Sequence, residues 1–310
     1  MSRPRSDNRG AALLMALLVT ISLAGIAVGF SRESGVDLDL ASFTRDGDRA
    51  YHLARSGLNT ALWMLLKDVD RQVDTLRQPW ADPKAIRLPA DPEEGTALLQ
   101  VVSDESGKLN LNRLIDESGA ADPLAEAQVK RLLALLGIPE GRLDPVLDWL
   151  DADNQERPNG AESLYYQSLD QPYDCANGPL LTMGQIGLIR GCKEILPDVR
   201  NYLTIYSDGK VNLNTASVVV LRSLSLRMDR SVAEAIVDYR KDKDFLSVED
   251  LRNIASVTQD IFEEIAPLLT VRSSAFSVSV KASVQAVESA IEAVVIRGDM
   301  DLKTIYWRVS

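Results

Sequence analysis

The chain has 310 residues, 45% hydrophobic and 25% charged, a composition typical of globular proteins rather than disordered or collagen-like ones. Its formal net charge of −11 disfavours a surface that binds nucleic acid by neutralising phosphates. The single histidine, His52, disfavours a histidine-rich metal site, and two cysteines are too few for a zinc ribbon. The length allows two or three domains with a substantial core.

The first thirty residues combine basic charge with a long apolar segment. Arg3, Arg5 and Arg9 outnumber Asp7, and residues 11–30 then carry no charge. At about 1.5 Å per residue, twenty helical residues span about 30 Å, the hydrocarbon thickness of a bilayer. Basic residues on the N-terminal side place that end in the cytoplasm and direct the acidic remainder across the membrane.

A cleaved secretory signal peptide is the alternative interpretation of this segment. Residues 27–29 (Ala-Val-Gly) would serve as a small-residue cleavage site. The apolar run is longer than a usual signal-peptide core, however, and the sequence continues without a helix breaker. From Arg32 to about Lys67 there is no proline, and apolar residues recur at helical spacing at Val36, Leu40, Phe43, Tyr51, Ala54, Leu58, Leu62 and Leu65. We therefore expect one long helix, apolar all round at first and amphipathic afterwards.

The junction of Arg9-Gly10 with the apolar residues 11–18 resembles the leader junction of type IV pilins and type II secretion pseudopilins. In that family a prepilin peptidase removes the short basic leader after the glycine and the new N-terminus is methylated. The resemblance therefore implies processing at Gly10 and Ala11, with a leader of residues 1–10 and a membrane-embedded helix of residues 11–30.

The fifth residue after the junction narrows the resemblance. Most family members have a glutamate there, whose carboxylate pairs with the N-terminal ammonium of a neighbouring subunit, whereas this chain has Met15. An unpaired carboxylate in lipid is costly, so a subunit with no partner ahead of it gains by losing the glutamate. The missing glutamate and the large size of the chain resemble the K family of minor pseudopilins.

The resemblance implies an α+β fold in which a long N-terminal helix packs on an antiparallel sheet, with a large helical insertion. Residues 96–103 form one expected strand, followed by a turn at residues 104–107, and residues 275–284, 290–297 and 304–309 form three more, with a turn at Gly298-Asp299. The expected domains are an amphipathic helix with the first part of the pilin-like core in residues 31–107, an inserted α-helical domain in residues 108–270, and C-terminal strands in residues 271–310.

The expected insertion contains an internal repeat. Residues 108–112 (KLNLN) are matched by residues 210–214 (KVNLN), and each copy is followed by segments that resemble helix-hairpin-helix or SAM-like units. Such units bind DNA through glycine-rich hairpins that let backbone N–H groups approach a phosphate. The second hairpin, residues 225–229, lacks glycine and contains Asp229. We therefore interpret the hairpins as packing modules and expect no nucleic-acid partner.

A dense group of polar residues lies between the two copies, in residues 148–174. Acidic and amide side chains at short spacing supply the oxygen ligands that calcium prefers, although the spacing is not that of an EF-hand loop. A solvated acidic loop and a glycosidase-like carboxylate pair are the alternatives. The group also resembles the signature of the K family, which is known to bind calcium. The possible calcium ligands are Asp151, Asp153, Asn154, Glu162 and Asp174.

Cys175 and Cys192 follow this acidic segment. In the oxidising periplasm that the resemblance implies, a disulfide between them is the expected state, and it would stabilise the fold by about 3 kcal/mol in the chain-entropy model.

Taken together, these features predict a non-enzymatic minor pseudopilin at the tip of the type II secretion pseudopilus. The resemblance implies a single-pass bacterial inner-membrane protein with a periplasmic head. Its expected partners are the minor pseudopilins I and J in a tip complex, with H and the major pseudopilin below. A membrane-anchored helix-hairpin-helix protein of a competence or type IV pilus system, binding DNA or calcium, is the alternative. A periplasmic carbohydrate hydrolase is a third, weaker one.

Overall fold

The computed structural model describes residues 9–68, 72–82, 96–298 and 301–310. Residues 1–8 of the predicted leader and Asp299 of the predicted turn lie outside the described residues. The helices are α1 (Arg9–Leu66), α2 (Pro123–Leu135), α3 (Asp144–Leu150), α4 (Ser163–Gln167), α5 (Leu196–Val199), α6 (Val218–Leu224), α7 (Arg230–Asp242) and α8 (Gln259–Ile265). The strands are β1 (Thr96–Asp104), β2 (Leu109–Asn110), β3 (Leu203–Thr204), β4 (Val211–Asn212), β5 (Leu269–Thr270), β6 (Ala275–Val284), β7 (Val287–Arg297) and β8 (Leu302–Val309).

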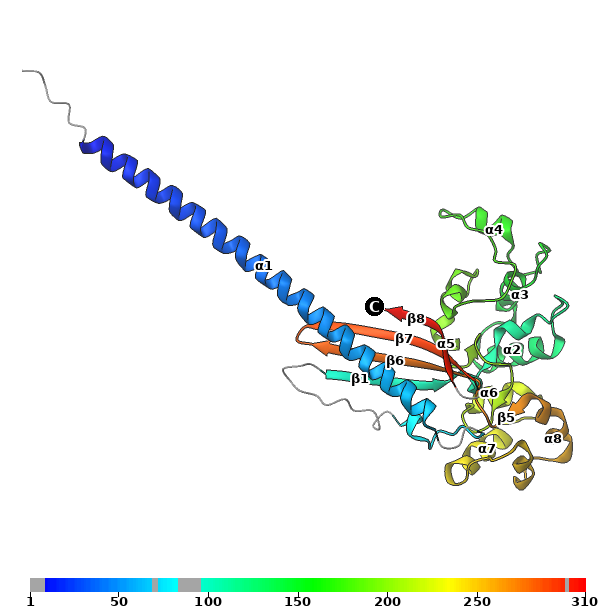
Figure 1. Ribbon diagram of the computed structural model, residues 1–310. Helices are drawn as coiled ribbons and strands as arrows, with labels where there is room; N and C mark the ends of the chain where they lie inside the picture. The colour runs from blue at the N-terminus through cyan, green and yellow to red at the C-terminus, as the bar shows by residue number, and fades with distance from the viewer. Residues whose placement is uncertain (1–8, 69–71, 83–95, 299–300) are drawn as a thin grey trace, which may run out of the picture.

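Helix α1 is continuous over 58 residues, which corresponds to a length of about 87 Å. Its first half projects from the rest of the molecule (Figure 1), and residues 10–33 are exposed. The apolar residues of this half therefore have no partner within the described part of the chain. The spacing predicts one apolar stripe from Val36 to Leu65, but Val36, Leu40 and Phe43 are exposed. The later members of the stripe are buried (Ala54, Leu58 and Leu65) or partly buried (Tyr51 and Leu62). The sheet ends before it reaches the earlier turns of the helix.

The C-terminal half of α1 packs on a four-stranded antiparallel sheet with the strand order β1-β6-β7-β8. Strand β1 is separated from β6 by about 170 residues of sequence, yet the two strands pair along almost their whole length, from Thr96 opposite Ser283 to Asp104 opposite Phe276. The helix and one sheet face enclose a core that includes Leu58, Leu65, Val280 and Ile291. The expected α+β, pilin-like fold is confirmed.

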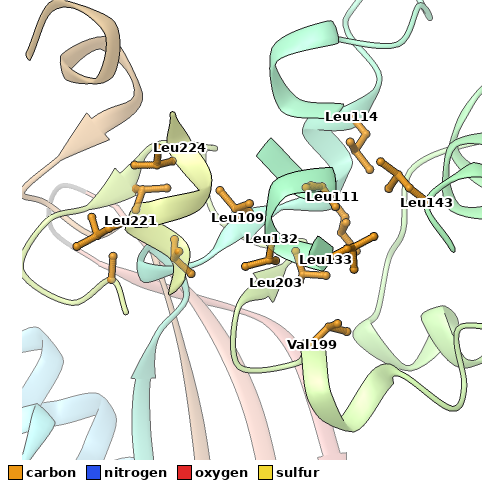
Figure 2. Close-up of a cluster of buried hydrophobic side chains, with 14 of the residues drawn as sticks. Leu109, Leu111, Leu114, Leu132, Leu133, Leu143, Val199, Leu203, Leu221 and Leu224 are labelled. Carbon is orange, nitrogen blue, oxygen red and sulfur yellow. The ribbon is translucent and has the colours of Figure 1, made fainter. Parts of the chain in front are cut away.

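The chain between β1 and β6 forms a separate, mainly helical domain at the end of the sheet furthest from the N-terminus of α1 (Figure 1). This domain has its own hydrophobic core, to which each of the helices α2 to α8 contributes, for example Leu132 of α2, Tyr166 of α4 and Leu221 of α6. Figure 2 shows leucines of α2 and α6 pointing toward one interior. The molecule therefore contains two hydrophobic cores, one for the pilin-like part and one for the insertion.

The inserted domain is built from two related units. Each begins with a short strand that pairs in parallel with a later one, β2 with β3 and β4 with β5. The last asparagine of each sequence repeat has the same role. Asn112 exchanges hydrogen bonds with the backbone of Leu180, where its side chain donates to the carbonyl and accepts from the N–H, and Asn214 does the same with Phe245. Both partners precede a helical turn with a capping box. The repeat in the sequence is thus a repeat in structure.

Because Leu180 and Phe245 occupy equivalent positions in the two units, they show where the acidic segment lies within the first unit. In the second unit only two residues separate the end of α7 at Asp242 from Phe245, whereas in the first unit α3 ends at Leu150, far ahead of Leu180. Residues 151–179 are therefore an additional loop carried by the first unit. Its short helix α4 lies at the outer edge of the domain (Figure 1).

Candidate metal centre

Three of the predicted ligands come together at the start of this loop. Carboxylate oxygens of Asp151, Asp153 and Glu162 all lie within 4.8 Å of one another. Asp151 directly follows the end of α3, Asp153 follows two positions later, and Glu162 directly precedes α4. The loop therefore turns back on itself and brings a residue eleven positions from Asp151 beside it.

The other two predicted ligands accept hydrogen bonds from other residues of the loop. Asn154 is exposed, and its Oδ1 accepts a hydrogen bond from Asn177 Nδ2 at 3.2 Å. Asp174 is exposed and its Oδ1 accepts from Gln167 Nε2 at 2.8 Å.

Glu162 has the environment of a group that lacks its partner. Glu162 is 5% exposed, and neither carboxylate oxygen has a side-chain partner among the described residues, although the backbone N–H of the neighbouring Ser163 lies close to the carboxylate. Burial, reinforced by the negative charges of Asp148, Asp151 and Asp153, raises the pKa of Glu162 to about 7. Asp151 is also buried, and its Oδ1 has no partner either. Buried polar groups are normally hydrogen-bonded or bound to an ion, so these orphaned oxygens fit a bound cation.

Asp148 and Arg157 support the cluster from the side of α3. The Asp148 carboxylate is fully buried, accepting from Arg157 Nη1 at 2.6 Å and from the backbone N–H of Ala161 at 2.9 Å. The same Arg157 nitrogen donates to Asp151 Oδ2 at 2.6 Å. A Cβ at Gly160 would lie 1.8 Å from Asp148 Oδ2, so only glycine lets the loop pass this close. Asp148 belongs to the acidic segment predicted from the sequence, but no feature of the sequence predicted a role for Arg157.

Asn177 is a further residue that sequence reasoning missed. Its backbone has a positive φ of 45°, and its side-chain Nδ2 donates to the Asp153 carbonyl at 3.0 Å. Its Oδ1 is buried without a partner. Asn177 therefore ties the far end of the loop to the residue that supplies one carboxylate of the cluster.

Cys175 and Cys192 correct one expectation from the sequence. Both are buried in the core of the inserted domain and both are free thiols, so the predicted disulfide is absent from the structure. The Cys175 thiol is directed at the carbonyl of Asp148, with 3.7 Å between Sγ and oxygen. Burial raises the pKa of Cys175 to about 11 and that of Cys192 to about 12, which keeps both thiols protonated.

The predicted processing residues, Gly10 and Ala11, lie exposed at the beginning of α1. The second hairpin offers no anion site, because Asp229 occupies the N-terminus of α7 and its Oδ1 accepts from the N–H of Val232 at 2.9 Å. A carboxylate there disfavours a phosphate at the same place. This observation counts against the DNA-binding alternative.

Comparisons with known proteins agree with this architecture. Residues 107–208 match the family model of type II secretion system protein K, and residues 207–270 match that of the helix-hairpin-helix motif. The chain is 32% identical over 199 residues to the putative type II secretion system protein K of Escherichia coli strain K12, covering 61% of this chain. That match spans 59% of the length of the Escherichia coli protein.

Two further similarities extend over most of the chain. Type II secretion system protein K of Pectobacterium carotovorum is 29% identical over 309 residues, covering 90% of each protein. The crystal structure of the GspK-GspI-GspJ complex of enterotoxigenic Escherichia coli contains a chain of the same fold, with a TM-score of 0.72 and 21% identity, covering 86% of this chain and 98% of that one. Sequence and fold agree: the chain is similar over most of its length to type II secretion system protein K, and residues 107–208 match the model of that family.

Proposed function

We propose that this chain is the non-enzymatic minor pseudopilin at the tip of the type II secretion pseudopilus, where it nucleates or caps assembly for protein export across the outer membrane. The similarity to type II secretion system protein K supports the minor pseudopilin role. The observation that supports the tip position is the placement of the inserted domain, which covers the end of the pilin-like core furthest from the apolar half of α1 (Figure 1). A subunit added above this end would meet the insertion rather than another helix and sheet.

The apolar half of α1 supports the inner membrane as the site of anchoring. The most apolar stretch of this half is not buried by any other described part of the chain. The helix is long enough to cross a bilayer once and continue into the head. Met15 is 68% exposed within this half and has no charge to pair with a subunit ahead of it. The basic residues before the helix favour a cytoplasmic N-terminus and hence a periplasmic head.

The proposed partners are the minor pseudopilins I and J, with H and the major pseudopilin below, and the prepilin peptidase during maturation. The solved complex whose K chain has the same fold contains GspI and GspJ, which supports the first two. We propose no nucleic-acid partner.

Site-specific cross-linking in cells tests the tip position. A photo-cross-linker at exposed Leu226 of the inserted domain should trap no pilin-like subunit, whereas one at exposed Trp63 of α1 should trap a minor pseudopilin. If pilin-like neighbours are trapped from both positions, the chain is an internal subunit and the tip assignment is wrong.

We also propose that the acidic loop binds calcium through Asp151, Asp153 and Glu162. Three carboxylates suit a hard divalent cation, and the orphaned, buried Glu162 carboxylate is the observation that supports occupancy. The ion would neutralise these charges and fasten the additional loop to the end of α3. Its role is thus structural.

Chelation of the full chain in detergent tests this proposal. EGTA should lower the melting temperature of the wild type, because an ion that binds only the folded state contributes RT ln(1 + [L]/Kd), about 2.7 kcal/mol at a hundredfold excess over Kd. Asp151→Ala with Asp153→Ala should abolish the response, whereas Asp174→Ala, outside the cluster, should retain it. Identical wild-type curves with and without EGTA would show that the loop is merely solvated.

A further inference from the structure

We propose that Arg157 is a counter-cation built into the acidic loop, which holds the loop on α3 when no metal ion is bound and competes electrostatically with the ion when one is. This inference rests on the calcium site proposed above. Arg157 is not one of the proposed ligands, yet it would set how strongly the stability of the fold depends on the ion.

The contacts of Arg157 show why it substitutes for a cation. Its Nη1 atom lies 2.6 Å from Asp148 Oδ1 and 2.6 Å from Asp151 Oδ2, so one positive group bridges two carboxylates. The Asp148 side chain is fully buried and that of Asp151 is 5% exposed, while 27% of the Arg157 side chain is exposed. Two buried carboxylates this close repel each other strongly unless a positive charge lies between them.

Asp151 connects Arg157 to the proposed ion. Its Oδ2 atom contacts Arg157, whereas its Oδ1 atom has no partner and the residue belongs to the cluster with Asp153 and Glu162. Arg157 and an ion in that cluster would therefore act on the same carboxylate. When all four carboxyl groups of Asp148, Asp151, Asp153 and Glu162 are ionised, they carry four negative charges, and Arg157 compensates one of them.

The backbone places Arg157 so that the loop closes without an ion. The Arg157 N–H donates to Asp148 Oδ2 at 3.2 Å, and the same oxygen accepts from the N–H of Ala161. The Arg157 guanidinium and two backbone groups of the loop thus converge on one buried carboxylate at the end of α3. These contacts attach the loop to α3 without an ion, so the three clustered carboxylates lie on a loop that is already held in place.

Two opposite effects follow from this arrangement. Removing the guanidinium leaves Asp148 and Asp151 without their counter-charge, so the ion-free protein should be strongly destabilised. The ion-bound protein loses less, because the ion still neutralises Asp151 and no longer faces a neighbouring positive charge. Because stability and binding are linked, Arg157→Gln must bind calcium more tightly than the wild type if its calcium-dependent gain in stability is larger.

The experiment measures melting temperatures of the full chain in detergent, purified with calcium and then split into samples with calcium chloride or EGTA. Tryptophan emission is a suitable signal because buried Trp149 lies two residues before this loop begins. In EGTA, Arg157→Gln should melt about 10 °C below the wild type. In calcium the difference should shrink to less than half of that. Calcium titration of the folded variants should show higher affinity in Arg157→Gln.

Two variants serve as controls. Arg157→Lys retains a positive charge and should give an intermediate calcium response, which also keeps the test informative if Arg157→Gln does not fold in EGTA. Arg230→Gln removes an arginine from an exposed pair with Glu234 on α7 and should respond to calcium like the wild type.

The outcomes separate this inference from the calcium site itself. If the wild type responds to calcium but Arg157→Gln responds equally or less, or binds calcium more weakly, Arg157 is not a counter-cation and the inference is overturned while the site stands. If neither protein responds, the calcium site and the inference both fail.

Discussion

Single buried charged residues also affect the stability of the protein outside the acidic loop. In the pilin-like part, Arg297 at the end of β7 is almost fully buried and pairs with the buried carboxylate of Asp74. A second nitrogen of Arg297 lies 3.7 Å from Asp68, and the guanidinium lies over the Phe276 ring, 4.7 Å from its centroid. Burial raises the pKa of Asp74 to about 6 even with Arg297 beside it. The carboxylate therefore depends on this arginine to remain charged.

The first prediction concerns this pair. Arg297→Met should lower the free energy of unfolding at pH 7 by about 3–5 kcal/mol, because it leaves the Asp74 carboxylate buried without a counter-charge. Denaturant titration of the full chain in detergent measures the loss. Arg308→Met, at an exposed position on β8, should change the value by less than about 0.5 kcal/mol. Equal effects of the two substitutions would show that the buried pair does not stabilise the fold.

The second prediction concerns the two thiols. In the folded protein at pH 8, Cys175 and Cys192 should react slowly with a thiol reagent such as DTNB, because both are buried and their raised pKa values leave little thiolate. After unfolding in guanidinium without a reductant, two thiols per chain should react rapidly. Protein isolated from cells that shows no reactive thiol after unfolding would contain a disulfide and contradict the free thiols of the structure.

At the scale of elements, α1 divides into two halves with different partners. The half that packs on the sheet buries Ala54, Leu58 and Leu65, whereas the first half has no partner in the described chain. Hydropathy alone identified the first half, because it is apolar on every side. The end of the packed region depends on how far the sheet extends along the helix, which periodicity does not reveal.

The third prediction concerns processing at the start of α1. Gly10→Val should prevent removal of the leader, and mass spectrometry should find the full-length chain instead of one that begins at Ala11. No atom lies within 4 Å of a Cβ at Gly10, so the substitution leaves the packing of the chain itself undisturbed and tests recognition by the peptidase. Gly25→Val is a matched control, since its surroundings are equally open. A wild-type mass that begins near Phe30 would instead indicate a cleaved signal peptide.

At the scale of the whole molecule, a buried polar junction joins the two hydrophobic cores. Asn212, in the first strand of the second unit, donates to the Asp74 carbonyl, to Asp104 Oδ2 and to Ser273 Oγ at 2.8–3.1 Å. Asp104 ends β1 and Ser273 precedes β6, so this one amide connects the insertion to both strands from which it emerges. Asp104 also accepts from Thr215 Oγ1 at 2.5 Å. The inserted domain is therefore anchored by specific contacts as well as by its two chain connections.

The fourth prediction follows from this junction. Asn212→Ala should lower the free energy of unfolding by about 1–3 kcal/mol, because it leaves several buried polar groups without a partner. It should also speed hydrogen exchange in peptides that cover residues 104–106 and 273–277. Asn110→Ala, at the equivalent position of the first unit, removes a contact with the Ser207 carbonyl inside the inserted domain and should leave exchange at the sheet unchanged. Faster exchange at the sheet in both variants would argue against a specific junction.

The sequence predicted part of the candidate site. It pointed to residues 148–174 as an acidic segment and named Asp151, Asp153 and Glu162, which the fold brings together. It also named Asn154 and Asp174, which the fold directs to other partners. Composition and spacing identify which residue types are available, but the direction of each side chain depends on the backbone path of an irregular loop.

The features that arise from local pattern could be predicted from the sequence: the apolar helix, the alternating strands, the repeated asparagine motif and the acidic loop. Each follows from the preferences of neighbouring residues, which act over a few turns or along one strand. Only the tertiary structure decided that Arg157 bridges Asp148 and Asp151, that Arg297 compensates Asp74, and that Asn212 joins the two cores. These contacts depend on which groups are removed from water together, and burial of a charge is a property of the assembled chain.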